Sequence, residues 1–154
     1  MTENTDVNKP VEILLVEDNP KDRELTLYSL KQNNLANNIE VAEDGEEALN
    51  FIFCKGRYEG RSKTNLPRVI LLDLKLPKVD GIEVLKKIKS DPIARLIPVV
   101  VLTSSREEKD LVESYRLGVN SYMVKPIDFG QFTDTVKELG LYWVLMNVVP
   151  KSIE

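Results

Sequence analysis

Three acidic side chains, a hydroxyl and an ammonium group are the residues of this chain that could do chemistry together. Glu17 and Asp18 are adjacent, Asp73 lies far downstream, and Thr103 and Lys125 follow later in the chain. Carboxylates that are packed together repel one another, so one must take up a proton or all must share a cation. Mg²⁺ would resolve this repulsion, because it binds one or two carboxylates together with a phosphoryl oxygen. Lys125 would add a point charge of the kind that holds phosphate.

Each of these groups follows a short apolar segment that is typical of a buried strand. The segments span residues 11–16, 69–72, 98–102 and 122–124, and a further short strand is expected over residues 39–42. These segments are short and contain β-branched residues, and both properties favour strands over helices. Ligands of a doubly wound sheet bind beyond the carboxyl ends of its strands. We therefore expect the acids, the hydroxyl and the ammonium to converge on one edge of one sheet.

Helix signals alternate with these strands. Asn19 and Pro20 predict a helix start, because Asn caps helices well and Pro suits the first helical position. Capping residues also stand at Asp44, Ser105 and Asp128. The first helix is expected to pack on the sheet through an apolar face made of Leu25, Leu27, Tyr28 and Leu30. The prediction is an α/β fold, a doubly wound five-stranded parallel sheet in the flavodoxin-like order 2-1-3-4-5 with five helices.

The overall composition narrows the classes of function. The chain has 154 residues, the size of one domain, and 21 Lys and Arg against 25 Asp and Glu leave a net charge of −4. That charge argues against bulk binding to nucleic acid or to an anionic membrane. The chain has no histidine, which excludes a Ser-His-Asp or Cys-His nucleophile, a His-ligated metal and histidine phosphotransfer on this chain.

The organisation of the chain is expected to be simple. Residues 1–10 are polar and predicted to be flexible, residues 11–147 to form a single domain, and residues 148–154 to form a C-terminal tail. The single cysteine, Cys54, cannot form an internal disulfide, so a reducing compartment fits. No apolar run is long enough to cross a membrane, and the N-terminus does not read as a secretory signal. We therefore expect a cytoplasmic protein.

The motifs resemble those of the CheY-like receiver domain of two-component response regulators, over residues 11–139. The residues that carry the resemblance are the Glu17-Asp18 pair, Asp73 within the segment LLDLKLP, Asp80-Gly81, Thr103, Tyr122 and Lys125-Pro126. The resemblance implies a phosphoacceptor signalling protein rather than a conventional enzyme. Such a protein assists its own phosphorylation and dephosphorylation.

The resemblance also implies how the site would work. Asp73 would accept the phosphoryl group from a sensor histidine kinase. Asp18 and Asp73 would bind Mg²⁺ or Mn²⁺ directly, together with the backbone carbonyl of Lys75, and Glu17 would act mostly through water. Lys125 would pair with a phosphoryl oxygen.

Two further residues would transmit the signal in a protein of this family. Thr103 would hydrogen-bond the phosphoryl group, and Tyr122 would turn inward with it. The face made by the fourth helix, the fifth strand and the fifth helix would then shift between two states. The Lys125–Pro126 peptide bond would be cis. Lys75 and Ser105 would flank the path of the hydrolytic water and alter the lifetime of the phosphoryl group.

A long loop over residues 54–67 and an apolar segment near the C-terminus distinguish this chain from a minimal receiver. Residues 140–146 read GLYWVLM, which is apolar on all sides of a helix and must be buried somewhere. Tyr142, Trp143 and Leu145 are therefore candidate interface residues. The two features resemble small phytochrome-associated response regulators of cyanobacterial type, which are stand-alone receivers that dimerise. This implies a homodimer, a phytochrome as kinase, and a histidine phosphotransfer protein as a downstream candidate.

Each residue also has a plainer interpretation. Glu17 and Asp18 alone could be a solvated strand end and a helix cap, Asp73 a turn acid and Lys125 a surface lysine. Tyr122 could be a core residue only, and the apolar C-terminal segment could pack on its own domain. Joint placement on one edge favours the functional interpretation, because independent accidents would scatter over both edges of the sheet.

Two other functions stay open. The chain could be a receiver-like binding module that never carries phosphate, although such a module has no need of the acidic cluster. It could also be a Mg²⁺-dependent phosphohydrolase of similar fold. That activity needs a second acid shortly after Asp73, where this chain has Leu74 and Lys75.

Overall fold

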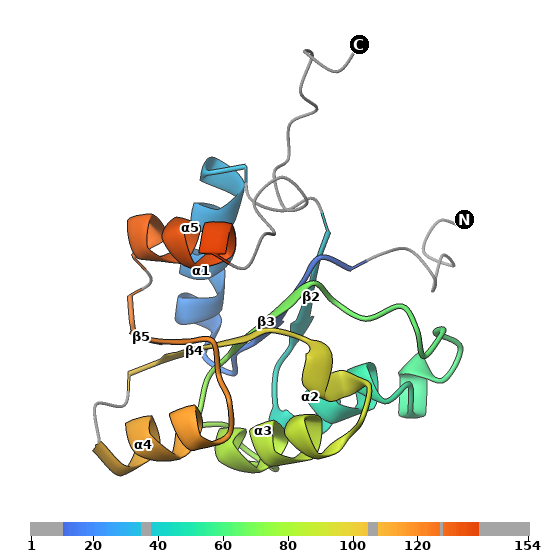
Figure 1. The fold of residues 1–154 in the computed structure, drawn as a ribbon. Coiled ribbons are helices and arrows are strands. Elements are labelled where there is room, and N and C mark those ends of the chain that lie inside the picture. Colours follow the sequence, from blue (N-terminus) through green and yellow to red (C-terminus); the bar gives the residue numbers. More distant parts are fainter. Residues whose placement is uncertain (1–10, 35–37, 105–107, 127, 139–154) are drawn as a thin grey trace.

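The computed structural model describes residues 11–34, 38–104, 108–126 and 128–138. Within these ranges the five predicted strands form one parallel sheet in the order β2-β1-β3-β4-β5. Figure 1 shows helices covering both faces of the sheet, so the predicted doubly wound α/β fold is confirmed. None of the helices in the described ranges is long and apolar enough to cross a membrane.

Strands and helices alternate along the chain as expected. The strands are β1 (Ile13–Val16), β2 (Ile39–Ala42), β3 (Val69–Leu72), β4 (Val99–Thr103) and β5 (Ser121–Val124). The α-helices are α1 (Pro20–Gln32), α2 (Gly45–Ile52), α3 (Gly81–Ser90), α4 (Glu108–Arg116) and α5 (Phe129–Glu138). Two short 3₁₀ helices are η2 (Gly56–Tyr58) and η3 (Ala94–Leu96).

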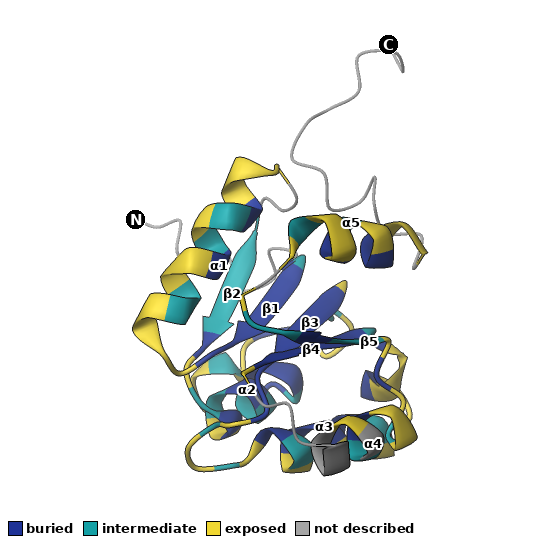
Figure 2. Cartoon of the chain, turned by 90° about the vertical axis from the view of Figure 1, so that its left-hand side faces the viewer, coloured by how far each residue is buried: buried dark blue, intermediate teal, exposed yellow. Residues whose placement is uncertain are grey.

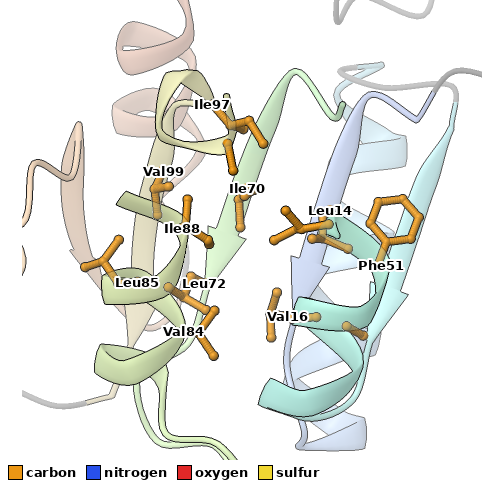
Figure 3. Close-up of a cluster of buried hydrophobic side chains, with 14 of the residues drawn as sticks. Leu14, Val16, Phe51, Ile70, Leu72, Val84, Leu85, Ile88, Ile97 and Val99 are labelled. Carbon is orange, nitrogen blue, oxygen red and sulfur yellow. The ribbon is translucent and has the colours of Figure 1, made fainter. Parts of the chain in front are cut away.

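The sheet is buried on both faces, which explains the continuous apolar runs of its inner strands. Successive strand residues point to opposite faces, so Leu14 and Val16 contact the core under α2 and α3, whereas Ile13 and Leu15 contact the core under α1 and α5. Figure 3 shows the first of these cores, with Leu14 and Val16 near α2. Figure 2 shows the helices buried toward the sheet and exposed on their outer sides.

The face that α1 presents to the sheet differs from the predicted one. Leu30 is fully buried, but Leu25 and Tyr28 have 60% and 62% of their surface exposed, and Thr26 is buried in their place. The prediction of Leu25 and Tyr28 as packing residues is therefore wrong. The helix is rotated so that Thr26 and Leu30, which are four residues apart on one side, meet the sheet.

The segment over residues 54–67 is only partly the surface loop that its polar composition suggests. Cys54 and Arg61 are both buried, at 8% and 7% exposure. Arg61 donates hydrogen bonds to the backbone carbonyls of Phe51 and Asn65, and its guanidinium carbon lies 3.7 Å from the centre of the Phe51 ring. A charged side chain therefore anchors this segment to the end of α2.

Candidate functional site

The chemistry-bearing residues lie at one edge of the sheet because β1, β3, β4 and β5 are parallel neighbours. Val16 pairs with Leu72, so Glu17 and Asp73 leave the sheet side by side. Thr103 pairs with Val124 at the same edge, one residue before Lys125. The predicted convergence of these groups is thus what the structure has.

Lys125 is at the centre of the cluster. Its Nζ lies 2.6 Å from Glu17 Oε1, 2.9 Å from Asp73 Oδ2 and 2.9 Å from Asp22 Oδ2. An ammonium group has three N–H donors, so these three carboxylates account for all of them. Burial opposes the charge on Lys125, but its hydrogen bonds to Glu17, Asp22 and Asp73 outweigh burial and raise its pKa. Lys125 is therefore a cation in the folded protein.

Glu17 is the most enclosed of the acids, at 1% exposure. Burial and the neighbouring charge of Asp73 raise the pKa of Glu17 to about 7, against the opposing effect of the Lys125 hydrogen bond. The backbone N–H of Asn19 donates to Glu17 Oε2 at 3.1 Å. Two donors thus hold the Glu17 carboxylate in place, although its surroundings disfavour the charged form. A bound cation would stabilise that negative charge.

The donor set fits a hard divalent metal. Glu17, Asp18 and Asp73 each offer a carboxylate oxygen, and these atoms all lie within 4.8 Å of one another. Asp18 is exposed while Glu17 and Asp73 are buried, so this acidic pocket has an open side toward solvent. Mg²⁺ and Mn²⁺ prefer such oxygen ligands, and Mg²⁺ keeps several waters, which an open side allows. Lys75 contributes its backbone N–H to Asp73 Oδ1 at 3.1 Å, which orients the acid.

The turn that carries Asp73 depends on a close backbone approach. Gly81 begins α3, and its N–H donates to the Leu74 carbonyl at 2.9 Å. A Cβ at Gly81 would lie 2.4 Å from the Leu74 Cα and 2.5 Å from the Asp73 carbonyl oxygen. Only glycine fits there, so the Asp80-Gly81 motif fixes the loop that presents Asp73.

Thr103 and Tyr122 occupy the β4–β5 side of the site. Thr103 is fully buried at the end of β4. Tyr122 is half-buried and packs against the core under α2 and α3. The Lys125–Pro126 peptide bond is cis, as the resemblance implied.

Asp22 is a member of the cluster that the sequence analysis missed. It lies in the first turn of α1, where an acid is ordinarily explained by the helix dipole. Because α1 begins only at Pro20, helical spacing from Asp18 gave no signal for Asp22.

Several predicted residues lie outside the described parts of the chain. These are Ser105 and the candidate interface residues Tyr142, Trp143 and Leu145. The predicted flexible N-terminus and C-terminal tail lie outside them as well.

A five-stranded parallel sheet in this order, with an acidic trio and a lysine at its carboxyl edge, defines the receiver class of signalling domain. The family model described as "Response regulator receiver domain" matches residues 13–137, and the chain belongs to this family. Receiver domains bind Mg²⁺ or Mn²⁺ at an acidic pocket, and the trio of this chain is such a pocket.

Two curated proteins are similar over nearly their whole length. The probable methanogenesis regulatory protein FilR2 of Methanothrix harundinacea is 43% identical over 141 residues, which cover 92% of this chain and 88% of FilR2. The response regulator Rcp1 of Synechocystis sp. is 40% identical over 145 residues, which cover 94% of this chain and 97% of Rcp1.

Solved structures of response regulators are also similar to this chain. The bacteriophytochrome response regulator AtBRR is 54% identical with a TM-score of 0.79, covering 91% of this chain and 99% of AtBRR. The Mn²⁺-bound form of Rcp1 is 40% identical with a TM-score of 0.71, covering 91% and 98% of the two chains. The phosphorylated cyanobacterial phytochrome response regulator RcpA has the same identity and TM-score, covering 88% and 95%.

Proposed function

We propose that this chain is a response regulator whose Asp73 accepts a phosphoryl group from a bacteriophytochrome histidine kinase. The observation that carries the proposal is the 2.9 Å contact of Lys125 Nζ with Asp73 Oδ2, inside the acidic trio. Similarity to AtBRR, and to the phosphorylated phytochrome response regulator RcpA, supports both the phosphorylation and the kinase class.

The proposed transfer is a displacement at phosphorus. An Asp73 oxygen attacks the phosphoryl group of the kinase phosphohistidine, a P–O bond forms, and the P–N bond breaks with its electron pair returning to the imidazole. Lys125 pairs with a phosphoryl oxygen and offsets its charge. Asp18, Asp73 and Glu17 would hold Mg²⁺, which supplies further charge neutralisation. Water later cleaves the acyl phosphate and regenerates the Asp73 carboxylate.

The proposed output is a change of the α4–β5–α5 face. A phosphoryl group on Asp73 would recruit the Thr103 hydroxyl, which is buried at the end of the neighbouring strand. Tyr122, half-buried on β5, would follow by turning inward. The face would thereby be biased between two states, because the new charge binds one of them better.

The proposed assembly is a homodimer whose interface includes Tyr142, Trp143 and Leu145. Support comes from the apolar GLYWVLM sequence, since an apolar segment of this kind needs a surface to cover it. A histidine phosphotransfer protein is the proposed downstream candidate, because an acyl phosphate on Asp73 is reactive enough to pass its phosphoryl group to an imidazole.

The test is transfer of labelled phosphate from the autophosphorylated kinase domain of a candidate bacteriophytochrome in the presence of Mg²⁺. We expect fast labelling of the wild type and none of Asp73→Asn, with size-exclusion chromatography before and after to detect a change of assembly. Labelling by acetyl phosphate but not by the kinase would overturn the phytochrome assignment. No label from either donor would favour the constitutive binding module, and repeated release of phosphate from small substrates would favour a phosphohydrolase.

A further inference from the structure

Asp22 differs from the other two carboxylates that contact Lys125. The side chains of Glu17 and Asp73 are 2% and 6% exposed, whereas that of Asp22 is 38% exposed. Asp22 is not a member of the trio whose oxygens lie close enough to share a metal. Asp22 is therefore the most exposed of the three carboxylates that accept a hydrogen bond from Lys125.

The backbone around Asp22 is tied down. Its N–H donates to the capping oxygen of Asn19 at 3.1 Å, and the next residue, Arg23, donates from its guanidinium to the Glu17 carbonyl at 3.1 Å. The first turn of α1 is thus attached to the end of β1. Release of Lys125 by Asp22 requires only rotation of the Asp22 side chain into water.

We propose that Asp22 is a positioning residue that holds Lys125 in the unphosphorylated state and yields it when the phosphoryl group arrives. The inference rests on the proposed function. It adds that Asp22 controls how readily Lys125 can bind a phosphoryl oxygen. All three ammonium donors are taken by carboxylates. A phosphoryl oxygen can gain a full bond from Lys125 only as a carboxylate bond weakens.

The exposure of each acid decides which carboxylate yields. Glu17 is enclosed, so breaking its bond to Lys125 would leave a buried carboxylate with only the Asn19 N–H as a donor, which is costly. Asp22 is partly solvated, so water replaces Lys125 as its partner at little cost. Phosphorylation turns the single charge of Asp73 into the two charges of an acyl phosphate, which draws the ammonium inward and away from Asp22.

The first experiment compares Asp22→Asn with Glu24→Gln in the full chain. Glu24 lies on the same helix, is exposed, and loses the same charge on substitution. The reaction measured is labelling by acetyl phosphate with Mg²⁺, in which an Asp73 oxygen bonds phosphorus and acetate leaves with the electron pair. We expect Asp22→Asn to be labelled roughly two- to fivefold faster than wild type, the range of a partly exposed ion pair. Glu24→Gln should match wild type.

A second measurement isolates the action through Lys125. Beryllofluoride, an analogue of the phosphoryl group, is titrated with Mg²⁺ and followed by ¹⁹F NMR. We expect Asp22→Asn to bind it more tightly by a similar factor and Asp22→Glu to restore the wild-type affinity. In a Lys125→Met background the Asp22→Asn substitution should have no effect.

Two results would overturn the inference while leaving the proposed function intact. One is a wild type that takes label while Asp22→Asn behaves like Glu24→Gln or is slower. The other is an effect of Asp22→Asn that persists in the Lys125→Met background. A wild type that takes no label and binds no beryllofluoride would instead overturn the proposed function, and the inference with it.

Discussion

A half-buried cation and a buried cation of this protein are held by different kinds of hydrogen-bond acceptor. Lys125 at the sheet edge contacts three carboxylates. Arg61, in the segment after α2, donates instead to the backbone carbonyls of Phe51 and Asn65 and stacks on the Phe51 ring. Hydrogen bonds to carboxylates outweigh burial and raise the pKa of Lys125, whereas burial lowers the pKa of Arg61.

The difference separates a site that can change partners from one that holds a fixed structure. Carboxylates on side chains can rotate, bind a metal or be esterified, so the Lys125 contacts are exchangeable. Backbone carbonyls cannot leave without unfolding their segment, and an unpaired buried carbonyl costs free energy. Substitutions at the first region should therefore change chemistry, and substitutions at the second should change stability.

Asp73→Asn should show the largest effect, a complete loss of label from acetyl phosphate, because an amide oxygen is not a competent nucleophile here. The free energy of unfolding without metal should stay within about 1 kcal/mol of wild type, since the lost pair with Lys125 is offset by less repulsion among the acids. Glu83→Gln, which removes an exposed acid in the first turn of α3, should keep its label. A labelled Asp73→Asn protein would place the phosphoacceptor elsewhere.

Arg61→Met should lower stability and leave phosphorylation unchanged. We expect it to lower the free energy of unfolding by about 3 kcal/mol in urea denaturation, because the carbonyls of Phe51 and Asn65 lose a charged donor. Label per folded molecule should not change. Arg57→Met is the control, since the Arg57 side chain is 67% exposed in its ion pair with Glu47, and it should cost less than about 1 kcal/mol. Equal losses in both variants would remove the distinction between the two regions.

Mg²⁺ should act on the first region alone. At ten times its dissociation constant it should stabilise the wild type by about 1.4 kcal/mol through binding to the folded state. Arg61→Met should gain the same increment, and Asp18→Asn should gain much less, because Asp18 belongs to the acidic trio. The measurement is urea denaturation with Mg²⁺ and with a chelator. An increment that survives in Asp18→Asn would show that the metal binds elsewhere.

Tyr58→Phe should have the smallest effect. The Tyr58 hydroxyl contacts Glu47 Oε2 at 2.9 Å and Arg57, close to solvent. Losing such a partly exposed bond should cost about 0.5 kcal/mol in the same denaturation assay, with labelling unchanged. A cost well above 1 kcal/mol would extend the structural region around Arg61 to this surface network.

The strands, their order and the meeting of Asp73 with Lys125 were predictable from the sequence. Continuous apolar runs indicate strands buried on both faces, and the carboxyl ends of parallel strands must share an edge. Any side chain directly after such a strand is placed by the backbone itself. Glu17, Asp73 and Lys125 are close together for this reason.

Asp22, Arg61 and the packing face of α1 were decided only by the tertiary structure. The direction of Asp22 depends on the rotation of α1 about its axis, and apolar spacing predicted a face with Leu25 and Tyr28 where the structure buries Thr26. The burial of Arg61 depends on carbonyls and an aromatic ring from other segments, which a polar local sequence does not reveal. Strand ends are positioned by hydrogen bonds between neighbouring parallel strands, whereas helix faces and loop anchors are positioned by what packs against them.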